Sequence, residues 1–266
     1  MNVWYTALTK EQVMPHISFS ALKIWKDCPH KYKLNYVDGK KKFLGNEYTV
    51  FGTALHEACE RKVLDNSVDE IQIFNTKFTE ELGKLPPEVV IENTVKKQMQ
   101  EQGERLASLV LGALTQYFGS FKVVSAEEEL LRNLDGTGYE FKGYVDLILQ
   151  TEDGKYHIID WKTCSWGWDA EKRNDPMTNY QLTLYKHFFT EIKGIDPKLV
   201  ETHFALLKRT AKKDHVELFR ITSGPKKVQN ALKILNNAVH NIENSNFPKN
   251  RLSCKYCEFY KSEECP

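Results

Sequence analysis

Two apolar segments that lie close together in the sequence place the strongest constraint on how this chain folds. Residues 143–149 read GYVDLIL and residues 157–163 read HIIDWKT. Short runs of this kind, rich in β-branched and aromatic residues, predict strands, and strands that are apolar at nearly every position are covered on both faces. The charged residues within these strands are Asp146, Asp160 and Lys162. Because a buried charge costs several kcal/mol unless it is paired or bound to a cation, we expect these three groups to act together.

The turn between the two segments determines which charged groups face each other. Residues 152–154, Glu-Asp-Gly, fit a three-residue hairpin loop whose glycine takes a left-handed conformation. In that register Asp146 lies opposite Asp160, on the same face as Lys162. A two-residue turn would instead put Asp146 opposite Trp161 and separate the two carboxylates. The chemistry of a shared site favours the first register.

Two facing carboxylates on buried strands repel each other unless a divalent cation lies between them. Oxygen ligands of this kind suit Mg²⁺ or Mn²⁺. Lys162 lies two residues beyond Asp160, where its ammonium can orient or deprotonate a metal-bound water or stabilise charge on a phosphate. The alternative is a structural ion pair between a buried aspartate and this lysine.

The rest of the chain predicts an α/β fold with a helical N-terminal part. Helical patterns extend to about residue 120, and the order that follows is three strands, a helix, two strands and a final helix. We expect a central mixed β-sheet flanked by helices. One integrated domain would contain a helical part over 1–120, an α/β core over 121–246 and a cysteine-rich tail over 247–266.

Charge and hydropathy exclude some classes of protein. The chain has 37 Lys and Arg against 36 Asp and Glu, so bulk charge cannot bind nucleic acid and a local basic surface would be needed. No run of about 18 apolar residues predicts a membrane span, and the N-terminal segment lacks the pattern of a secretory signal. We therefore expect a cytoplasmic protein, of a prokaryote or of a phage-infected host cell, whose cysteines stay reduced.

Three of the six cysteines are concentrated at the C-terminus. Cys254, Cys257 and Cys265 have the spacing C-x2-C-x7-C, which is typical of ligands for a soft metal. A tetrahedral metal site needs a fourth ligand in addition to these three. The alternative interpretation is three independent thiols on a surface tail.

The order of the motifs resembles the PD-(D/E)XK nucleases, and more closely their RecB-like branch. Val145-Asp146, a gap of 13 residues and Asp160-Trp161-Lys162 are similar to the signature of that superfamily. Residues 17–36, ISFSALKIWKDCPHKYKLNY, resemble the N-terminal S-x-S…CP…Y segment of the branch, and GTALHE at 52–57 resembles its G-x-x-x-H helix. The resemblance extends over about residues 17–265, nearly the whole chain.

The resemblance implies a restriction-endonuclease-like core and assigns roles to its residues. The implied metal ligands are His56, Asp146, Asp160 and the main-chain carbonyl of Trp161. Lys162 is implied to activate water for in-line attack on a phosphodiester. Glu128 best matches the first-strand acid of the branch. Gln181 and Tyr185 match its Q-x-x-x-Y helix motif and, one helical turn apart, share a face that can orient the substrate or the lysine.

The same resemblance gives the cysteines a purpose. Cys28, in the CP motif, together with Cys254, Cys257 and Cys265 is similar to the iron–sulfur staple of the AddB nucleases and of CRISPR-associated RecB-like exonucleases. This implies a structural 4Fe–4S cluster, with Zn²⁺ as the alternative, that joins the N-terminal helices to the C-terminus. The seven residues between Cys257 and Cys265 are slightly more than the family pattern has, which leaves the cluster type open.

Basic and aromatic side chains are the expected guides for a nucleic acid. Lysine and arginine residues can contact phosphates, and exposed tryptophans can stack on bases. The candidates are Lys40, Lys41, Lys42, Lys208, Arg209, Lys212, Lys213, Trp166 and Trp168.

Together these features predict a metal-dependent DNA exonuclease that acts in recombination, repair, replication or CRISPR-type processing. The chain has no ATPase motif of the form G-x-x-x-x-G-K-[ST], so we expect it to act on single strands or DNA ends, or beside a separate helicase or recombination protein. Two alternatives remain at this stage. One is a nuclease-fold subunit that binds DNA ends without cutting, and the other is a zinc-stapled structural DNA-binding protein.

Overall fold

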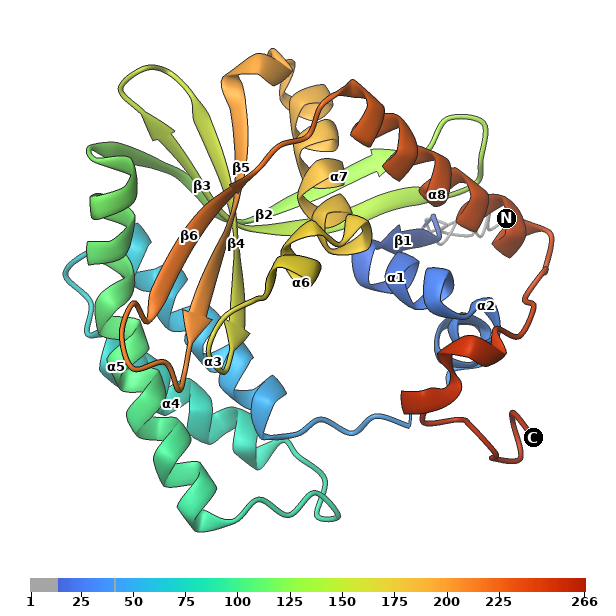
Figure 1. The fold of residues 1–266 in the computed structure, drawn as a ribbon, viewed down its shortest axis with the longest axis horizontal. Coiled ribbons are helices and arrows are strands. Elements are labelled where there is room, and N and C mark those ends of the chain that lie inside the picture. Colours follow the sequence, from blue (N-terminus) through green and yellow to red (C-terminus); the bar gives the residue numbers. More distant parts are fainter. Residues whose placement is uncertain (1–13, 41) are drawn as a thin grey trace, which may run out of the picture.

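A six-stranded mixed sheet lies at the centre of the protein, with helices on both of its faces (Figure 1). The structure is a computed structural model that describes residues 14–40 and 42–266. The sheet order is β1-β3-β4-β5-β6, and β2 also pairs with β3. The strands are β1 (His16–Ser18), β2 (Phe121–Asn133), β3 (Glu140–Thr151), β4 (Tyr156–Cys164), β5 (Val200–Lys208) and β6 (Val216–Ile221).

The helices before and after the sheet strands divide between its two faces. The α-helices are α1 (Phe19–Asp27), α2 (Pro29–Tyr32), α3 (Glu47–Leu64), α4 (Glu70–Gly83), α5 (Asn93–Phe118), α6 (Ala170–Asn174), α7 (Pro176–Lys193) and α8 (Pro225–Glu243). Short helical turns of other types are η1 (Lys33–Val37), η2 (Pro197–Leu199) and η3 (Arg251–Tyr256). No helix among the described residues is both long enough and apolar enough to cross a membrane.

The predicted element order is confirmed, and with it the α/β fold class. The one strand that sequence patterns did not indicate is β1, which has three residues and pairs in parallel with β3. A strand this short carries no measurable alternation of apolar and polar residues, so nothing in the local sequence predicts it.

Alternation along the central strands fills a separate core on each face of the sheet. Ile148 and Ile158 face α1, α7 and α8, whereas Leu147, Ile159 and Trp161 face α3, α4 and α5. All five of these side chains have no exposed surface. Both faces are therefore covered, as the apolar sequence of these strands predicts.

The hairpin has the register in which the two aspartates face each other. Leu147 pairs with Ile159, and Gly154 has a φ of 81°, the left-handed value that a glycine in this loop allows. Pairing of β3 with β4 ends at Leu147 and Ile159, and β1 pairs with β3 further along, at residues 140–142. The two strands therefore separate at Asp146 and Asp160, which opens the sheet where its charged groups lie.

A close approach of two helices on one face of the sheet depends on a single glycine. A Cβ atom at Gly103 of α5 would lie 1.9 Å from Cζ of Phe74 in α4. Gly103→Ala should therefore destabilise the protein by about 1–3 kcal/mol through overpacking, although alanine is the better helix former. Gly112→Ala in the same helix meets no atom within 4 Å and is the matched control, which should be neutral or stabilising. Chemical denaturation of the two variants measures both effects; an unchanged midpoint for Gly103→Ala would contradict this packing.

Candidate active site

The two aspartates of the hairpin lie where β3 and β4 separate. Asp146 Oδ2 accepts a hydrogen bond of 2.7 Å from the backbone N–H of Trp161, so its carboxylate replaces a missing strand partner. Asp160 is 2% exposed, and its Oδ2 lies 2.6 Å from the Nζ atom of Lys162. The predicted grouping of the two aspartates with Lys162 is therefore present.

Helix α3 brings a histidine and a further acid to the same place. The helix starts with a capping box in which the Asn46 side chain accepts from the N–H of Thr49 and the Thr49 hydroxyl oxygen accepts from the N–H of Asn46. One helical turn separates His56 from Glu60, so both side chains lie on one face. Ligand atoms of His56, Glu60 and Asp146 all lie within 4.8 Å of one another. The Nδ1 atom of His56 is 3.7 Å from Oδ2 of Asp146.

Glu60 is a candidate ligand that the sequence analysis missed, although its spacing of four residues from His56 could have indicated it. Its carboxyl group shares a hydrogen bond with Glu127 of β2. Burial and the charges of Glu127 and Asp146 raise the pKa of Glu60 to about 9. Glu127 has a φ of 50°, an uncommon value for a residue other than glycine.

The structure does not bring Glu128 into this group, contrary to the prediction. Its carboxylate lies 2.6 Å from Nζ of Lys193 at the end of α7. Adjacent residues of a strand point to opposite faces, and Glu127, beside it, is the β2 acid near the site. A run of three glutamates gives no local signal for which one turns inward.

Burial dominates the electrostatics of the group. It raises the pKa of Asp146 to about 6, against the lowering effect of the Lys162 charge and the Trp161 N–H. It raises the pKa of Asp160 to about 6 as well, again opposed by Lys162. Burial lowers the pKa of His56 to about 4, so the imidazole is neutral at physiological pH. A neutral imidazole has the free lone pair that a metal ion requires.

The donor set fits a hard divalent cation. Buried Oε1 of Glu60 makes no hydrogen bond to any described residue, and buried Oδ2 of Asp160 has the Lys162 ammonium at 2.6 Å as its partner. A buried carboxyl oxygen without a donor is costly, and a cation satisfies it.

Two residues of α7, Gln181 and Tyr185, lie beside the aspartates of this group. Gln181 donates a hydrogen bond of 3.2 Å from Nε2 to Oη of Tyr185, so the predicted polar pair forms. Burial raises the pKa of Tyr185, and the nearby charge of Asp160 adds to the effect. A Cβ atom at Gly143 of β3 would lie 2.8 Å from Cε1 of Tyr185, so this glycine leaves room for the ring.

The chain as a whole matches one family. Residues 16–262 match the model of the PD-(D/E)XK nuclease superfamily. The protein belongs to this superfamily. Its members are nucleases that use divalent metal ions, which agrees with the donors described above.

Similar proteins agree with this assignment. The chain is 25% identical to the CRISPR-associated exonuclease Cas4 of Saccharolobus solfataricus over 215 residues, which cover 77% of this chain and 95% of the relative. A Eubacterium rectale protein named as a candidate exonuclease has the same fold, with a TM-score of 0.61 at 14% identity. That match covers 97% of this chain and 92% of the other.

The four cysteines predicted to act together line one small cavity of the nuclease. Cys28 lies between α1 and α2, and the others lie in or after η3: Cys254, Cys257 and Cys265. The backbone N–H of Asn250 donates to Sγ of Cys28 at 3.4 Å, and Arg251 donates from Nη1 to Sγ of Cys265 at 3.9 Å. Sulfur atoms that surround one cavity and accept hydrogen bonds fit a thiolate-bound metal group. Cys59 and Cys164 are not among the lining residues.

Three of the nine predicted DNA contacts are engaged inside the protein. Lys208 is 7% exposed and pairs with Glu217, and Arg209 is 9% exposed with its guanidinium over the ring of Tyr48. Trp168 is 9% exposed and packs on Phe204. These three side chains have little surface left for DNA, because each packs against a residue of another helix or strand, which the local sequence does not show.

The remaining candidates keep at least part of their surface. Lys42 pairs with Glu264 at 2.8 Å, which ties it to the C-terminal tail. Trp166 is 78% exposed, and Lys40, Lys212 and Lys213 are exposed too. Lys41 lies outside the described residues. The nuclease thus retains one exposed tryptophan and several lysines from the predicted set.

The raised pKa of Asp146 predicts a measurable gain of stability on neutralisation. The folded protein binds a proton on this carboxyl more tightly than the unfolded chain, so ionisation destabilises the fold increasingly from about pH 4 to about pH 6. At pH 7 and without metal, the free energy of unfolding of Asp146→Asn should therefore be higher than that of wild type. The difference is at most about 3 kcal/mol, because each unit of pKa shift corresponds to about 1.4 kcal/mol.

Thermal unfolding at pH 4 and pH 7 tests this, with the exposed Asp135→Asn as a control that should show no gain. The same Asp146→Asn variant should bind Mn²⁺ less tightly in calorimetric titration. Unchanged Mn²⁺ affinity would contradict the ligand role of Asp146.

Proposed function

We propose that the protein is a Mg²⁺- or Mn²⁺-dependent DNA exonuclease. The observation that carries the proposal is the group of His56, Glu60 and Asp146, whose ligand atoms lie within 4.8 Å of one another, with Asp160 and the Lys162 ammonium beside it. A pure binding protein has no need to bury several acids beside one another, because the desolvation of each costs free energy in the absence of a cation.

Each residue has a definite part in the proposed reaction. The three acids and His56 would hold the cation, which polarises the scissile phosphate and lowers the pKa of the attacking water. Lys162, held 2.6 Å from Asp160, would orient that water and stabilise charge on the phosphate in the transition state. Gln181 and Tyr185 would position the substrate beside the lysine. The main-chain carbonyl of Trp161 remains a proposed further ligand.

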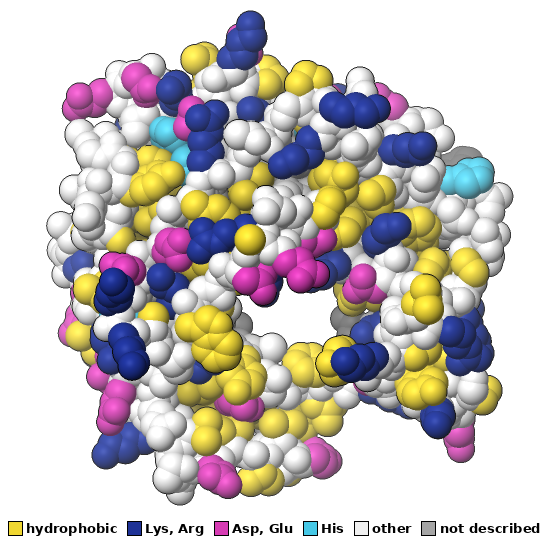
Figure 2. All heavy atoms as spheres, viewed as in Figure 1, with side chains coloured by type: hydrophobic (Ala, Val, Ile, Leu, Met, Phe, Trp, Pro, Cys, Tyr) yellow, Lys and Arg dark blue, Asp and Glu magenta, His cyan; other side chains and the backbone are white. Residues whose placement is uncertain are grey.

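The shape of the molecule supports a flexible strand as substrate. Figure 2 shows an opening through the protein whose border carries hydrophobic, basic and acidic side chains. In the same view the opening lies between α3, α6 and α2, and the segment from η1 to α3 passes along its lower side (Figure 1). A single strand can enter such an opening from an end, with bases on exposed rings and phosphates near lysines. The exposed Trp166 and Lys212 are the proposed contacts.

The cysteine-lined cavity is proposed to hold a structural 4Fe–4S cluster, with Zn²⁺ as the alternative. Four thiolates are soft ligands that suit either group and suit the hard catalytic cation poorly. The cluster would join α1 and α2 to the C-terminal tail, which already meet through the hydrogen bond from Asn250 Nδ2 to the backbone oxygen of Asp27. Its proposed role is structural because the cysteines would fill every protein ligand position.

The proposed biological setting is the processing of DNA ends beside other proteins. The similarity to the Cas4 exonuclease makes CRISPR-type processing one candidate setting, alongside recombination, replication and repair. A separate helicase or recombination protein would supply duplex opening, since the chain lacks an ATPase motif.

A comparison of linear and circular single-stranded DNA tests the exonuclease proposal. With Mn²⁺ present, the linear strand should be degraded from an end, and labels at the 5′ and 3′ termini report the direction. A circular strand of the same sequence should survive. Cleavage of the circle at the same rate would show that the protein is an endonuclease and not an exonuclease. Binding of linear DNA without cleavage would support the alternative of a subunit that only binds DNA ends.

A further inference from the structure

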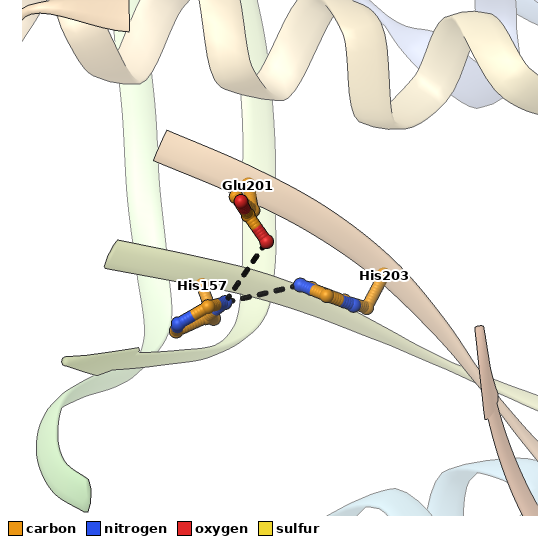
Figure 3. A group of neighbouring side chains, drawn as sticks. All are labelled: His157, Glu201 and His203. Carbon is orange, nitrogen blue, oxygen red and sulfur yellow. Dashed lines mark hydrogen bonds and ion pairs between the residues drawn. The ribbon is translucent and has the colours of Figure 1, made fainter. Parts of the chain in front are cut away.

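A second group of potential metal ligands lies near the start of β4, three residues before Asp160. We propose that His157, Glu201 and His203 form a binding site for a borderline transition-metal cation, with Zn²⁺ as the expected ion (Figure 3). This site is distinct from the nuclease centre and does not depend on the proposed nuclease function.

The parallel pairing of β4 with β5 brings the three residues together. His157 pairs with Glu201, and His203 follows Glu201 by two residues, so all three side chains project from one face of the sheet. Nδ1 of His157 lies 3.1 Å from Nε2 of His203 and 4.0 Å from Oε2 of Glu201. Nitrogen ligands bound to one tetrahedral Zn²⁺ at about 2.05 Å lie about 3.3 Å apart. The two imidazole nitrogens share a hydrogen bond at a separation close to that of two ligands of one ion, and the carboxylate lies within 4.8 Å of both.

Hydrogen bonds outside the group fix the orientation of His157. The Thr151 hydroxyl donates to Oδ1 of Asp153 at 2.6 Å, and the pKa of Asp153 is lowered to about 2, so this carboxylate can only accept. Having used its one proton, the hydroxyl must accept from Nε2–H of His157 at 2.9 Å. The lone pair of His157 is thereby left on Nδ1, the atom that faces Glu201 and His203. Outer contacts of this kind set the tautomer of histidines that bind metals.

Burial keeps both rings ready for a metal ion. His157 is 6% exposed and His203 is 2% exposed. Desolvation lowers the pKa of both, that of His203 to about 3, so each ring is neutral at physiological pH. Without an ion, the lone pair on Nδ1 of His157 accepts from Nε2–H of His203. When Nε2 of His203 binds the ion, its proton moves to Nδ1 of the same ring, which has no hydrogen-bond partner among the described residues.

The cations that now neutralise Glu201 are easily released. Arg220 lies 3.3 Å and Lys155 3.5 Å from Oε1 of Glu201, and their side chains are 52% and 40% exposed. Ion pairs this exposed contribute little, about 0–1 kcal/mol, so an incoming divalent ion can displace them into solvent. The site therefore retains a carboxylate that can compensate part of the charge of the ion.

The donor types decide the class of metal. Two imidazoles and one carboxylate suit Zn²⁺ and its neighbours in the first transition series, whereas Mg²⁺ prefers oxygen ligands alone. Three protein ligands leave a fourth position, which faces a surface hollow lined by Tyr117, Ser120 and Glu152. A water molecule from that hollow would be the fourth ligand of the ion. The bound ion would join the starts of β4 and β5 beneath the C-terminal end of α5.

Zinc stoichiometry measured by equilibrium dialysis tests the site. Anaerobically purified protein, with its cysteines in their native state and excess Mg²⁺ present, is dialysed against Zn²⁺ and the bound metal is determined by elemental analysis. Wild type should bind one equivalent more than Glu201→Gln. His203→Gln should lose the same equivalent, whereas His240→Gln, at an exposed position of α8, is the matched control and should retain it. Thr151→Val, which removes the hydroxyl that accepts from His157 and donates to Asp153, should weaken the affinity by about 10–100-fold.

Circular dichroism accompanies the dialysis because His203 is buried and its replacement can unfold the chain. Glu201→Gln keeps the shape of a partly exposed side chain, so a folded Glu201→Gln that lacks the equivalent supports the site. Equal stoichiometry in folded Glu201→Gln and wild type would overturn the proposal and leave a structural histidine pair. In His56→Gln the equivalent should persist; its loss there would assign the ion to the nuclease centre and also overturn the proposal.

Discussion

Replacement of Lys162 by alanine should reduce DNA cleavage by about 10²–10⁴-fold, the contribution typical of a positioned acid–base group. The Lys162 ammonium lies 2.6 Å from Asp160, and its charge also lowers the pKa of Asp146. The carboxylates and His56 stay in place, so Mn²⁺ should still bind in calorimetric titration. Cleavage that survives at more than about a tenth of the wild-type rate would contradict the assigned role.

Lys142→Ala is the matched control for this variant. Lys142 also lies on a central strand, but its Nζ atom pairs with Glu129 at 2.8 Å, away from the aspartates. Its replacement should leave cleavage close to wild type. If both lysine variants lost activity equally, the effect would reflect a general loss of positive charge rather than chemistry at Asp160.

Replacement of Cys28 by serine should remove the cluster and destabilise the whole protein. Cys28 and Cys254 are 226 positions apart, so a group bound to both closes a long loop and restricts the unfolded chain. The loss of a native cross-link of this kind typically costs about 2–5 kcal/mol. Iron and zinc analysis with thermal unfolding of anaerobically purified protein measures both effects. The residual soluble fraction should cleave with an unchanged product pattern.

Cys164→Ser serves as the control, because Cys164 does not line the cluster cavity. It should keep the full metal content. If the wild-type protein is colourless and contains one zinc ion, the cavity holds Zn²⁺ and not an iron–sulfur cluster. Normal metal content in Cys28→Ser would remove Cys28 from the ligand set.

The parts of the site that the sequence predicts are those determined by local rules. The Glu-Asp-Gly loop allowed two registers, and the chemistry of a shared site favoured the one with Asp146 opposite Asp160, which the pairing of Leu147 with Ile159 confirms. The helical spacing of Gln181 and Tyr185 likewise predicts the hydrogen bond that they form. In both cases the interacting residues are close in the chain, so short-range geometry is sufficient.

The parts that the sequence does not predict depend on contacts between distant segments. Glu127 rather than Glu128 reaches the centre because the pairing of β2 with β3 places Glu127 across from Asp146. The burial of Arg209 depends on Tyr48 of α3 and Gln102 of α5. The three ligands of the proposed zinc site come together only through the pairing of β4 with β5. No local pattern identifies such partners in advance.

Hydrolysis of end-labelled single-stranded DNA by wild type and Asp160→Asn is the most direct test of a metal-dependent nuclease centre. Asp160 is a buried acid paired with Lys162, and asparagine keeps its shape while removing the charge that a cation needs. Wild type should release labelled nucleotides with Mg²⁺ or Mn²⁺ and none with EDTA, and folded Asp160→Asn should release none with either ion. Equal release by the two proteins, or release that continues in EDTA, would contradict the account.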